Sequence, residues 1–210
     1  MARFIDLLTF SGSVGDVVGC QGPYGFYIRS RPRKSEKAPS RKQREARTKL
    51  GMAMAFLKPL KEIIYVGFAS AHPSRSKTAA MNAAASHLLN YAMEGEFPDI
   101  SINPAAVRLS RGTLMPLPDV SLEQTGSEIT VMWSPMLSPF SGHADDRVMV
   151  ICYNLEEESV EVGEAVRQDG LLTLDLSELP VGSTSIVYVC VADRNGKQFS
   201  NSQFIGRIEQ

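Results

Sequence analysis

Two short motifs carry residue types that proteins use for catalysis or metal binding. Ser74 and Lys77 have the S-x-x-K spacing of serine acyltransferases, in which the lysine helps to activate the serine. Those enzymes also carry S-D-N and K-T-G motifs, and neither accompanies Ser74 in this sequence. A helix start with a solvated lysine explains the pair more simply. The sequence therefore predicts no catalytic residue and a protein that is not an enzyme.

The second motif contains possible metal ligands. His143, Asp145 and Asp146 lie within four residues and could hold a cation in a loop between two strands. Hard cations usually take more oxygen ligands than two adjacent carboxylates supply. His72 and His87 have no second ligand at the spacing of a metal site. We interpret the second motif as a solvated loop and expect neither a metal nor another cofactor.

A run of glycines near the start of the chain could form a phosphate-binding loop. It comprises Gly12, Gly15, Gly19, Gly22 and Gly25. A phosphate loop needs a strand before it and a helix N-terminus after it, so that free N–H groups face the anion. Here β-branched and aromatic residues follow, which favours a bent hairpin of two strands at about 14–20 and 24–30.

The basic segment, residues 29–49, has the most functional weight. It contains ten basic and two acidic residues, a net charge of +8. Such a density of cations could neutralise several phosphates of a nucleic acid, with aromatic residues just upstream available for stacking. The same residues could instead form a solvated face or contact a protein partner. The candidate contact residues are Arg29, Arg31, Arg33, Lys34, Arg41, Lys42 and Arg44.

Two helices are expected after the basic loop. Ser40 and Gln43 have the spacing of a capping box, which predicts a helix start at Arg41. Pro59 should end or kink this helix, and a second helix should begin near Ser76 or Thr78. The apolar stripe expected to be buried comprises Ala46, Leu50, Met54 and Leu57. Residues 1–112 are therefore predicted to form a basic α+β domain, in which the glycine-rich hairpin and the two helices pack together.

The second half of the chain has a different pattern. Residues 118–210 contain seven short strand-like segments separated by turn residues, which is typical of a β-sandwich. They carry five basic and fifteen acidic residues, a net charge of −10. This contrast with the basic first half supports two domains. Residues 113–117, which include Pro116, are predicted to be the linker.

Parts of the second half resemble fibronectin type III domains. The segment ITVMWSP, with Trp133, is similar to the second strand of that fold, where a core tryptophan sits. LSELPVGST and YVCVADRNGKQFSNS resemble its later turn, sixth strand, hairpin and last strand. The corner tyrosine of the family would fall at about Ser185 and is missing. The resemblance implies an immunoglobulin-like sandwich but no particular function, because one fold hosts many functions.

The whole chain also resembles an uncharacterised family known only as a domain of unknown function. The similar segments are SGSVGDVVG, YIRSRP, AFLKPL, SRG and NGKQFSNS. That family implies no activity, cofactor or catalytic residue.

Composition narrows the remaining possibilities. The hydrophobic and charged fractions, 43% and 21%, are typical of soluble globular proteins. No apolar run approaches the roughly 18 residues of a membrane helix, and no signal-peptide core is visible. Three cysteines without metal-like spacing fit a reducing compartment. We expect a cytoplasmic, non-enzymatic protein that docks a protein partner, with nucleic-acid binding through residues 29–49 as the alternative. The identity of the partner and the oligomeric state stay open.

Overall fold

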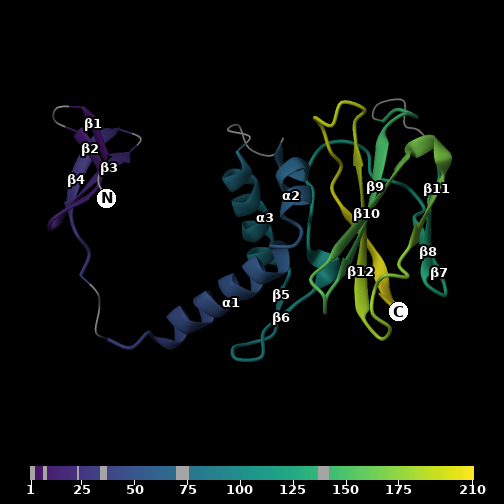
Figure 1. Ribbon diagram of the computed structural model, residues 1–210, viewed down its shortest axis with the longest axis horizontal. Coiled ribbons are helices and arrows are strands. Elements are labelled where there is room, and N and C mark those ends of the chain that lie inside the picture. The colour runs from purple at the N-terminus through teal and green to yellow at the C-terminus, as the bar shows by residue number, and fades with distance from the viewer. Residues whose placement is uncertain (1–2, 7–8, 23, 34–36, 70–75, 137–141) are drawn as a thin grey trace. The chain divides into compact units, whose positions relative to one another are not determined.

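The computed structural model describes residues 3–6, 9–22, 24–33, 37–69, 76–136 and 142–210 (Figure 1). The chain forms two compact units, Met1–Ser40 and Arg41–Gln210. This division differs from the predicted domains at 1–112 and 118–210. The helices belong to the same compact unit as the sandwich, and the glycine-rich strands form a unit of their own.

The first unit is a four-stranded antiparallel sheet in the order β1-β2-β3-β4. Its strands are β1 (Arg3–Asp6), β2 (Thr9–Val14), β3 (Val17–Gly22) and β4 (Gly25–Ser30). The predicted hairpin is confirmed as β3 and β4. Gly19 lies opposite Gly12, and a Cβ on Gly19 would overlap the backbone carbonyl of Phe10, so the close approach of the chain requires glycine there. A strand follows the β2–β3 turn, so these glycines do not form a phosphate loop at a helix N-terminus.

The second unit begins with three helices: α1 (Arg41–Leu57), α2 (Lys61–Gly67) and α3 (Lys77–Tyr91). The predicted helix start at Arg41 and the interruption around Pro59 are confirmed. The side chain of Ser76 accepts a hydrogen bond of 3.1 Å from the backbone N–H of Ala79, which caps α3. No helix in the described part of the chain is long and apolar enough to cross a membrane.

Seven strands then form the β-sandwich that the sequence predicted. They are β7 (Ser121–Thr125), β8 (Glu128–Met132), β9 (Arg147–Asn154), β10 (Val160–Val166), β11 (Leu171–Asp175), β12 (Thr184–Ala192) and β13 (Gln203–Glu209). One antiparallel sheet has the order β10-β9-β12-β13, and the other has the order β11-β8-β7. Trp133 is buried between the two sheets with Val150 and Val189, which confirms it as a core residue.

One face of the sheet β10-β9-β12-β13 packs against the three-stranded sheet, and the helices cover its other face. Phe56 of α1 packs edge-on against Tyr153 of β9, with ring centroids 5.3 Å apart. Leu88 of α3 belongs to the same buried cluster as Ile186 and Tyr188 of β12. The second unit therefore has three layers, in which the four-stranded sheet lies between the helices and the three-stranded sheet (Figure 1). The predicted split into a complete α+β domain and a separate all-β domain is wrong, because helices and sandwich share a core.

The chain between the helices and the sandwich is also bound to the sandwich. A short hairpin of β5 (Met93–Glu94) and β6 (Ser101–Ile102) leads into a 3₁₀ turn at Pro104–Ala106. In the predicted linker, the backbone N–H and C=O of Leu117 both pair with the side-chain amide of Gln203, each at 3.0 Å. Residues 113–117 are therefore part of the folded unit.

Candidate functional site

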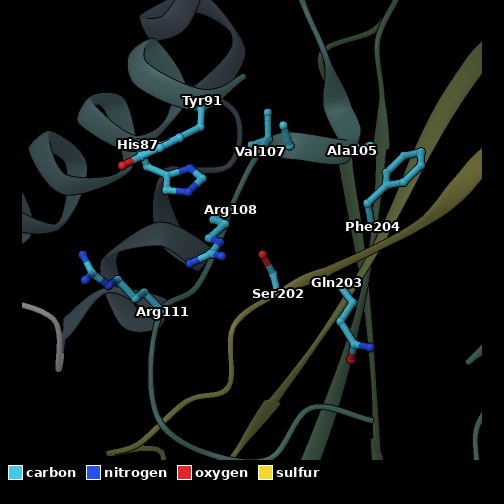
Figure 2. Close-up of a pocket in the computed structure, with 10 residues that line it drawn as sticks. His87, Tyr91, Ala105, Val107, Arg108, Arg111, Ser202, Gln203 and Phe204 are labelled. Atoms are coloured by element: carbon cyan, nitrogen blue, oxygen red, sulfur yellow. The ribbon is translucent and has the colours of Figure 1, made fainter. Parts of the chain in front are cut away.

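A cavity of about 890 Å³ opens in the second unit between α3, residues 105–111 and the start of β13. Figure 2 shows the side chains that line it. Those that carry charge, a polar atom directed at the cavity or an aromatic ring are His87, Tyr91, Arg108, Arg111, Ser202 and Phe204. All three walls belong to one compact unit, so the fold of residues 41–210 sets the shape of the cavity.

Helix α3 supplies one wall. His87 and Tyr91 are four residues apart and therefore lie on the same helix face. Their rings are 4.9 Å apart and inclined by 37°. His87 is half-buried, whereas Tyr91 is 71% exposed. The imidazole thus lies within the cavity and the phenol lies at its rim.

Hydrogen bonds to the sandwich hold the second wall. The hydroxyl of Tyr188 donates to the backbone carbonyl of Pro104 at 2.8 Å. The backbone N–H of Leu109 donates to Oγ of Ser202 at 2.8 Å, which joins the Arg108 segment to the start of β13. Val107 and Leu109 are buried, and the half-buried Arg108 between them lines the cavity together with Val107.

The electrostatics of the cavity favour negative charge. None of the described residues that line it is acidic, whereas Arg108 and Arg111 are cationic. Burial is the main cause that lowers the pKa of His87 below its ordinary value of 6.5, and the charges of Arg108 and Arg111 lower it further. Nδ1 of His87 is buried and has no hydrogen-bond partner within the described part of the chain. The site therefore offers guanidinium charge beside a neutral imidazole.

Sequence reasoning missed this site. The sequence indicates His87 only as a possible metal ligand, and Arg108 and Arg111 fall outside the basic segment, residues 29–49. The available signal was the alternation around Arg108, where a cation stands between two apolar residues. That pattern indicates an outward-facing side chain on a packed segment, but it does not identify which element faces that side chain.

The predicted contact residues of the basic segment are distributed over both units. The described ones are all exposed: Arg29, Arg31 and Arg33 in the first unit, and Arg41, Lys42 and Arg44 in the second. Lys34 lies outside the described residues. The described cations are therefore accessible, and each group of three belongs to its own unit.

Helix α1 departs from its predicted burial. Leu57 is buried as expected, but Leu50 and Met54 are 48% and 39% exposed. The buried positions are instead Ala53, Phe56 and Leu57, near the C-terminal end of the helix. The predicted stripe is wrong because the contacts with the sheet involve only this last part of α1. The N-terminal half presents charge and apolar surface to solvent.

The structure describes only part of the possible catalytic motif. Ser74 lies outside the described residues, and Nζ of Lys77 lies 5.0 Å from the ring centroid of Tyr65. The described residues contain no group of three or more metal-ligating side chains. Asp145 forms an exposed ion pair, in which its Oδ2 lies 3.7 Å from Nη1 of Arg194.

Asp146 corrects the interpretation of residues 143–146 as a solvated loop. It is fully buried, and its Oδ2 accepts a hydrogen bond of 2.8 Å from the backbone N–H of His143. The same oxygen lies 3.7 Å from Nε of Arg167, which is also fully buried. Nη2 of Arg167 donates to the carbonyl of Met115 at 2.7 Å. Asp146 is therefore a structural residue that helps to fix the chain before the sandwich.

The family assignment follows from a match over residues 9–206. The chain belongs to the Family of unknown function (DUF6266). The match covers described parts of both compact units, so the DUF6266 pattern extends beyond the sandwich. No curated protein matches this DUF6266 chain.

The solved structures similar to this DUF6266 chain include fibronectin type III domains. The FN1–FN3 domains of chicken CNTN1 are 15% identical with a TM-score of 0.37, over 48% of this chain and 33% of that one. The fn3 domain of the human collagen alpha-1(XX) chain is 14% identical with a TM-score of 0.36, over 46% of this chain and 85% of that one. This chain thus spans about a third of the chicken CNTN1 chain. These likenesses carry no functional argument, and the sandwich is defined by its own strand order.

Proposed function

We propose that this protein is a non-enzymatic docking protein that binds a protein partner through the N-terminal half of α1. The observation that carries this proposal is the exposure of Leu50 and Met54, at 48% and 39%, on a helix whose other large apolar residues are buried or half-buried. Isolated exposed apolar residues are common, but these two lie one helical turn apart and form a continuous stripe with Ala46.

Charge surrounds this stripe. At 3.6 residues per turn, Lys42 lies on one side of the stripe and Arg47 lies on the other. Nζ of Lys49 lies 2.7 Å from Oε1 of Glu45, so Lys49 is held in an ion pair along the helix. A partner that complements this arrangement has an apolar groove with acidic residues at its edges, which is the common way of binding an amphipathic helix.

Nucleic-acid binding is the second candidate, and the exposed cations of residues 29–44 favour it. Phosphates need only the cations, because the nucleic-acid backbone offers nothing apolar to Leu50 and Met54. The two functions therefore predict different responses to substitution. Docking in a groove depends on both apolar and charged residues, whereas phosphate binding depends on charge alone.

A site-specific photo-crosslinker at Arg47 of the full chain tests the docking function in cells that produce the protein. The double variant Leu50→Gln/Met54→Gln removes the apolar stripe, and Lys42→Glu reverses a flanking charge. Val181→Gln is the matched control, because Val181 is 95% exposed in the sandwich. Substitutions at exposed sites usually change stability by within about 0.5 kcal/mol, so these variants should fold.

The expected result is one reproducible crosslinked protein that is lost in the double variant, reduced by Lys42→Glu and retained in Val181→Gln. Equal crosslinking by all variants would overturn the docking function. Fluorescence anisotropy with a generic DNA duplex at low salt tests the alternative. Binding that survives Leu50→Gln/Met54→Gln but falls on charge reversal would favour nucleic acid instead.

A further inference from the structure

We propose that the cavity between α3, residues 105–111 and β13 binds a small organic anion. The ligand class is an apolar or aromatic body that carries a carboxylate or phosphate group. The volume of about 890 Å³ lies within the range of roughly 300–1,000 Å³ that is usual for small-molecule sites. This site lies on different residues from the exposed stripe of α1, so it does not depend on the docking function.

The anionic group is assigned to the end of the cavity near Arg108. A guanidinium presents a planar fork of donors that matches a carboxylate or a phosphate. Arg108 is half-buried, so water screens its charge less than it screens an exposed arginine. Arg111 adds positive charge to the same cavity.

Two further polar groups can contact the same anion. Oγ of Ser202 accepts from Leu109, which leaves its O–H as a donor, and Figure 2 shows this hydroxyl on the side of Arg108. The buried Nδ1 of His87 gains a partner when its N–H donates a hydrogen bond to the anion. A bound anion would also offset the positive charges that lower the pKa of His87, so binding should raise that pKa.

The body of the ligand is assigned to the opposite end. Figure 2 shows Phe204 and Ala105 separated from His87 and the two arginines. Phe204 is fixed by an edge-on contact with the buried ring of Tyr188, with centroids 5.7 Å apart. The amide of Gln203 points away from this space and is held by Leu117, so it does not compete for the ligand. A cationic end and an aromatic end together select an amphipathic anion.

The test is a titration of the full chain, followed by NMR, with four probes: phenyl phosphate, benzoate, inorganic phosphate and the neutral benzamide. Phenyl phosphate and benzoate separate the two kinds of anionic group. The expected result is saturable shifts at His87, Ser202 and Phe204 with at least one aromatic anion, and a rise in the pKa of His87. Inorganic phosphate should bind more weakly, because it lacks the body that contacts Phe204. Benzamide should bind at least about tenfold more weakly.

Arg108→Gln should weaken the binding of the aromatic anion by about tenfold or more. Arg207→Gln is the matched control, because Arg207 is an exposed arginine on the same strand as Phe204 and does not line the cavity. Equal binding of benzamide and the anions, or unchanged affinity in Arg108→Gln, would overturn the proposal. The comparison of benzamide with the anions uses the unmodified protein, so it decides the question even if Arg108→Gln fails to fold. Absence of saturable shifts with both aromatic anions would overturn it as well.

Discussion

The hydroxyl of Tyr188 donates a hydrogen bond of 2.8 Å to the backbone carbonyl of Pro104, and both residues are buried. Tyr188 lies in β12, a strand of the sheet β10-β9-β12-β13 that is buried on both faces. Pro104 opens the 3₁₀ turn that leads into the wall of the cavity. Burial raises the pKa of Tyr188 well above its ordinary value of 10, so the phenol stays a donor at physiological pH. This bond links the core of the sandwich to the shape of the candidate site.

Tyr188→Phe tests the energetic importance of that bond. The substitution removes the donor and leaves the carbonyl of Pro104 buried without it, which should lower the free energy of unfolding by about 1–3 kcal/mol. Urea unfolding measures the change. Tyr91→Phe is the control, because Tyr91 is 71% exposed and should change stability by within about 0.5 kcal/mol. Equal losses in the two variants would show that the buried bond contributes no stability.

The strands could be predicted from the sequence, but the position of the helices could not. The segments VMVICY and IVYVCVA are apolar without interruption, which is typical of strands buried on both faces. A plain two-layer sandwich would have polar residues on its outer faces. The uninterrupted apolar character of those segments therefore indicates that a third layer covers the outer face of their sheet. Periodicity gives the faces of a strand that are buried but not the element that covers them, so the sequence alone does not show that the helices cover the sandwich rather than the glycine-rich sheet.

The candidate site could not be predicted for a related reason. His87 and Arg108 are brought together by the packing of α3 against residues 104–111. No motif spacing records that contact, because it depends on the third layer. The basic segment, in contrast, was visible as composition alone. Its described candidate contact residues are exposed, as charge and polarity predict, but exposure does not select a partner.

A second prediction concerns the buried pair of Asp146 and Arg167. Both are fully buried, and Nε of Arg167 lies 3.7 Å from Oδ2 of Asp146. Arg167→Met leaves the carboxylate buried without its cation, which should cost about 3–5 kcal/mol of stability. Asp146→Asn/Arg167→Met removes both charges and should be more stable than Arg167→Met alone. A double-mutant cycle by urea unfolding measures the coupling, and strictly additive losses would contradict it.

The third prediction concerns the thiols. Cys152 faces the core between the two sheets, whereas Cys190 faces the helices, so they lie on opposite faces of the four-stranded sheet. Burial raises the pKa of Cys152 to about 11 and that of Cys190 to about 12. Neither should form a disulfide with the other or react with iodoacetamide at pH 8 in the native state. Mass spectrometry should find native labelling at Cys20 alone and labelling of all three cysteines after denaturation. Rapid native labelling of Cys152 or Cys190 would contradict their burial.

The last prediction is the pH dependence that His87 gives to stability. Burial, followed by the charges of Arg108 and Arg111, lowers the pKa of His87 in the folded protein below 6.5. The unfolded chain therefore binds the proton more readily than the folded one. The neutral His87 therefore contributes to the free energy of unfolding. This contribution is fully present above pH 6.5 and is lost as the pH falls through the pKa of His87 in the folded protein.

Urea unfolding from pH 7.5 to 5 measures this effect. In His87→Gln the fall of stability with decreasing pH should become shallower, because this side chain no longer takes up a proton on unfolding. Arg108→Gln should act in the same direction but more weakly, since burial remains the larger cause of the lowered pKa. An aromatic anion bound in the cavity stabilises the native state at each pH by mass action. It should also protect most at the acidic end, where His87 takes up a proton in the complex. Identical slopes in the unmodified protein and His87→Gln would show that the imidazole is not placed in the environment described for the cavity.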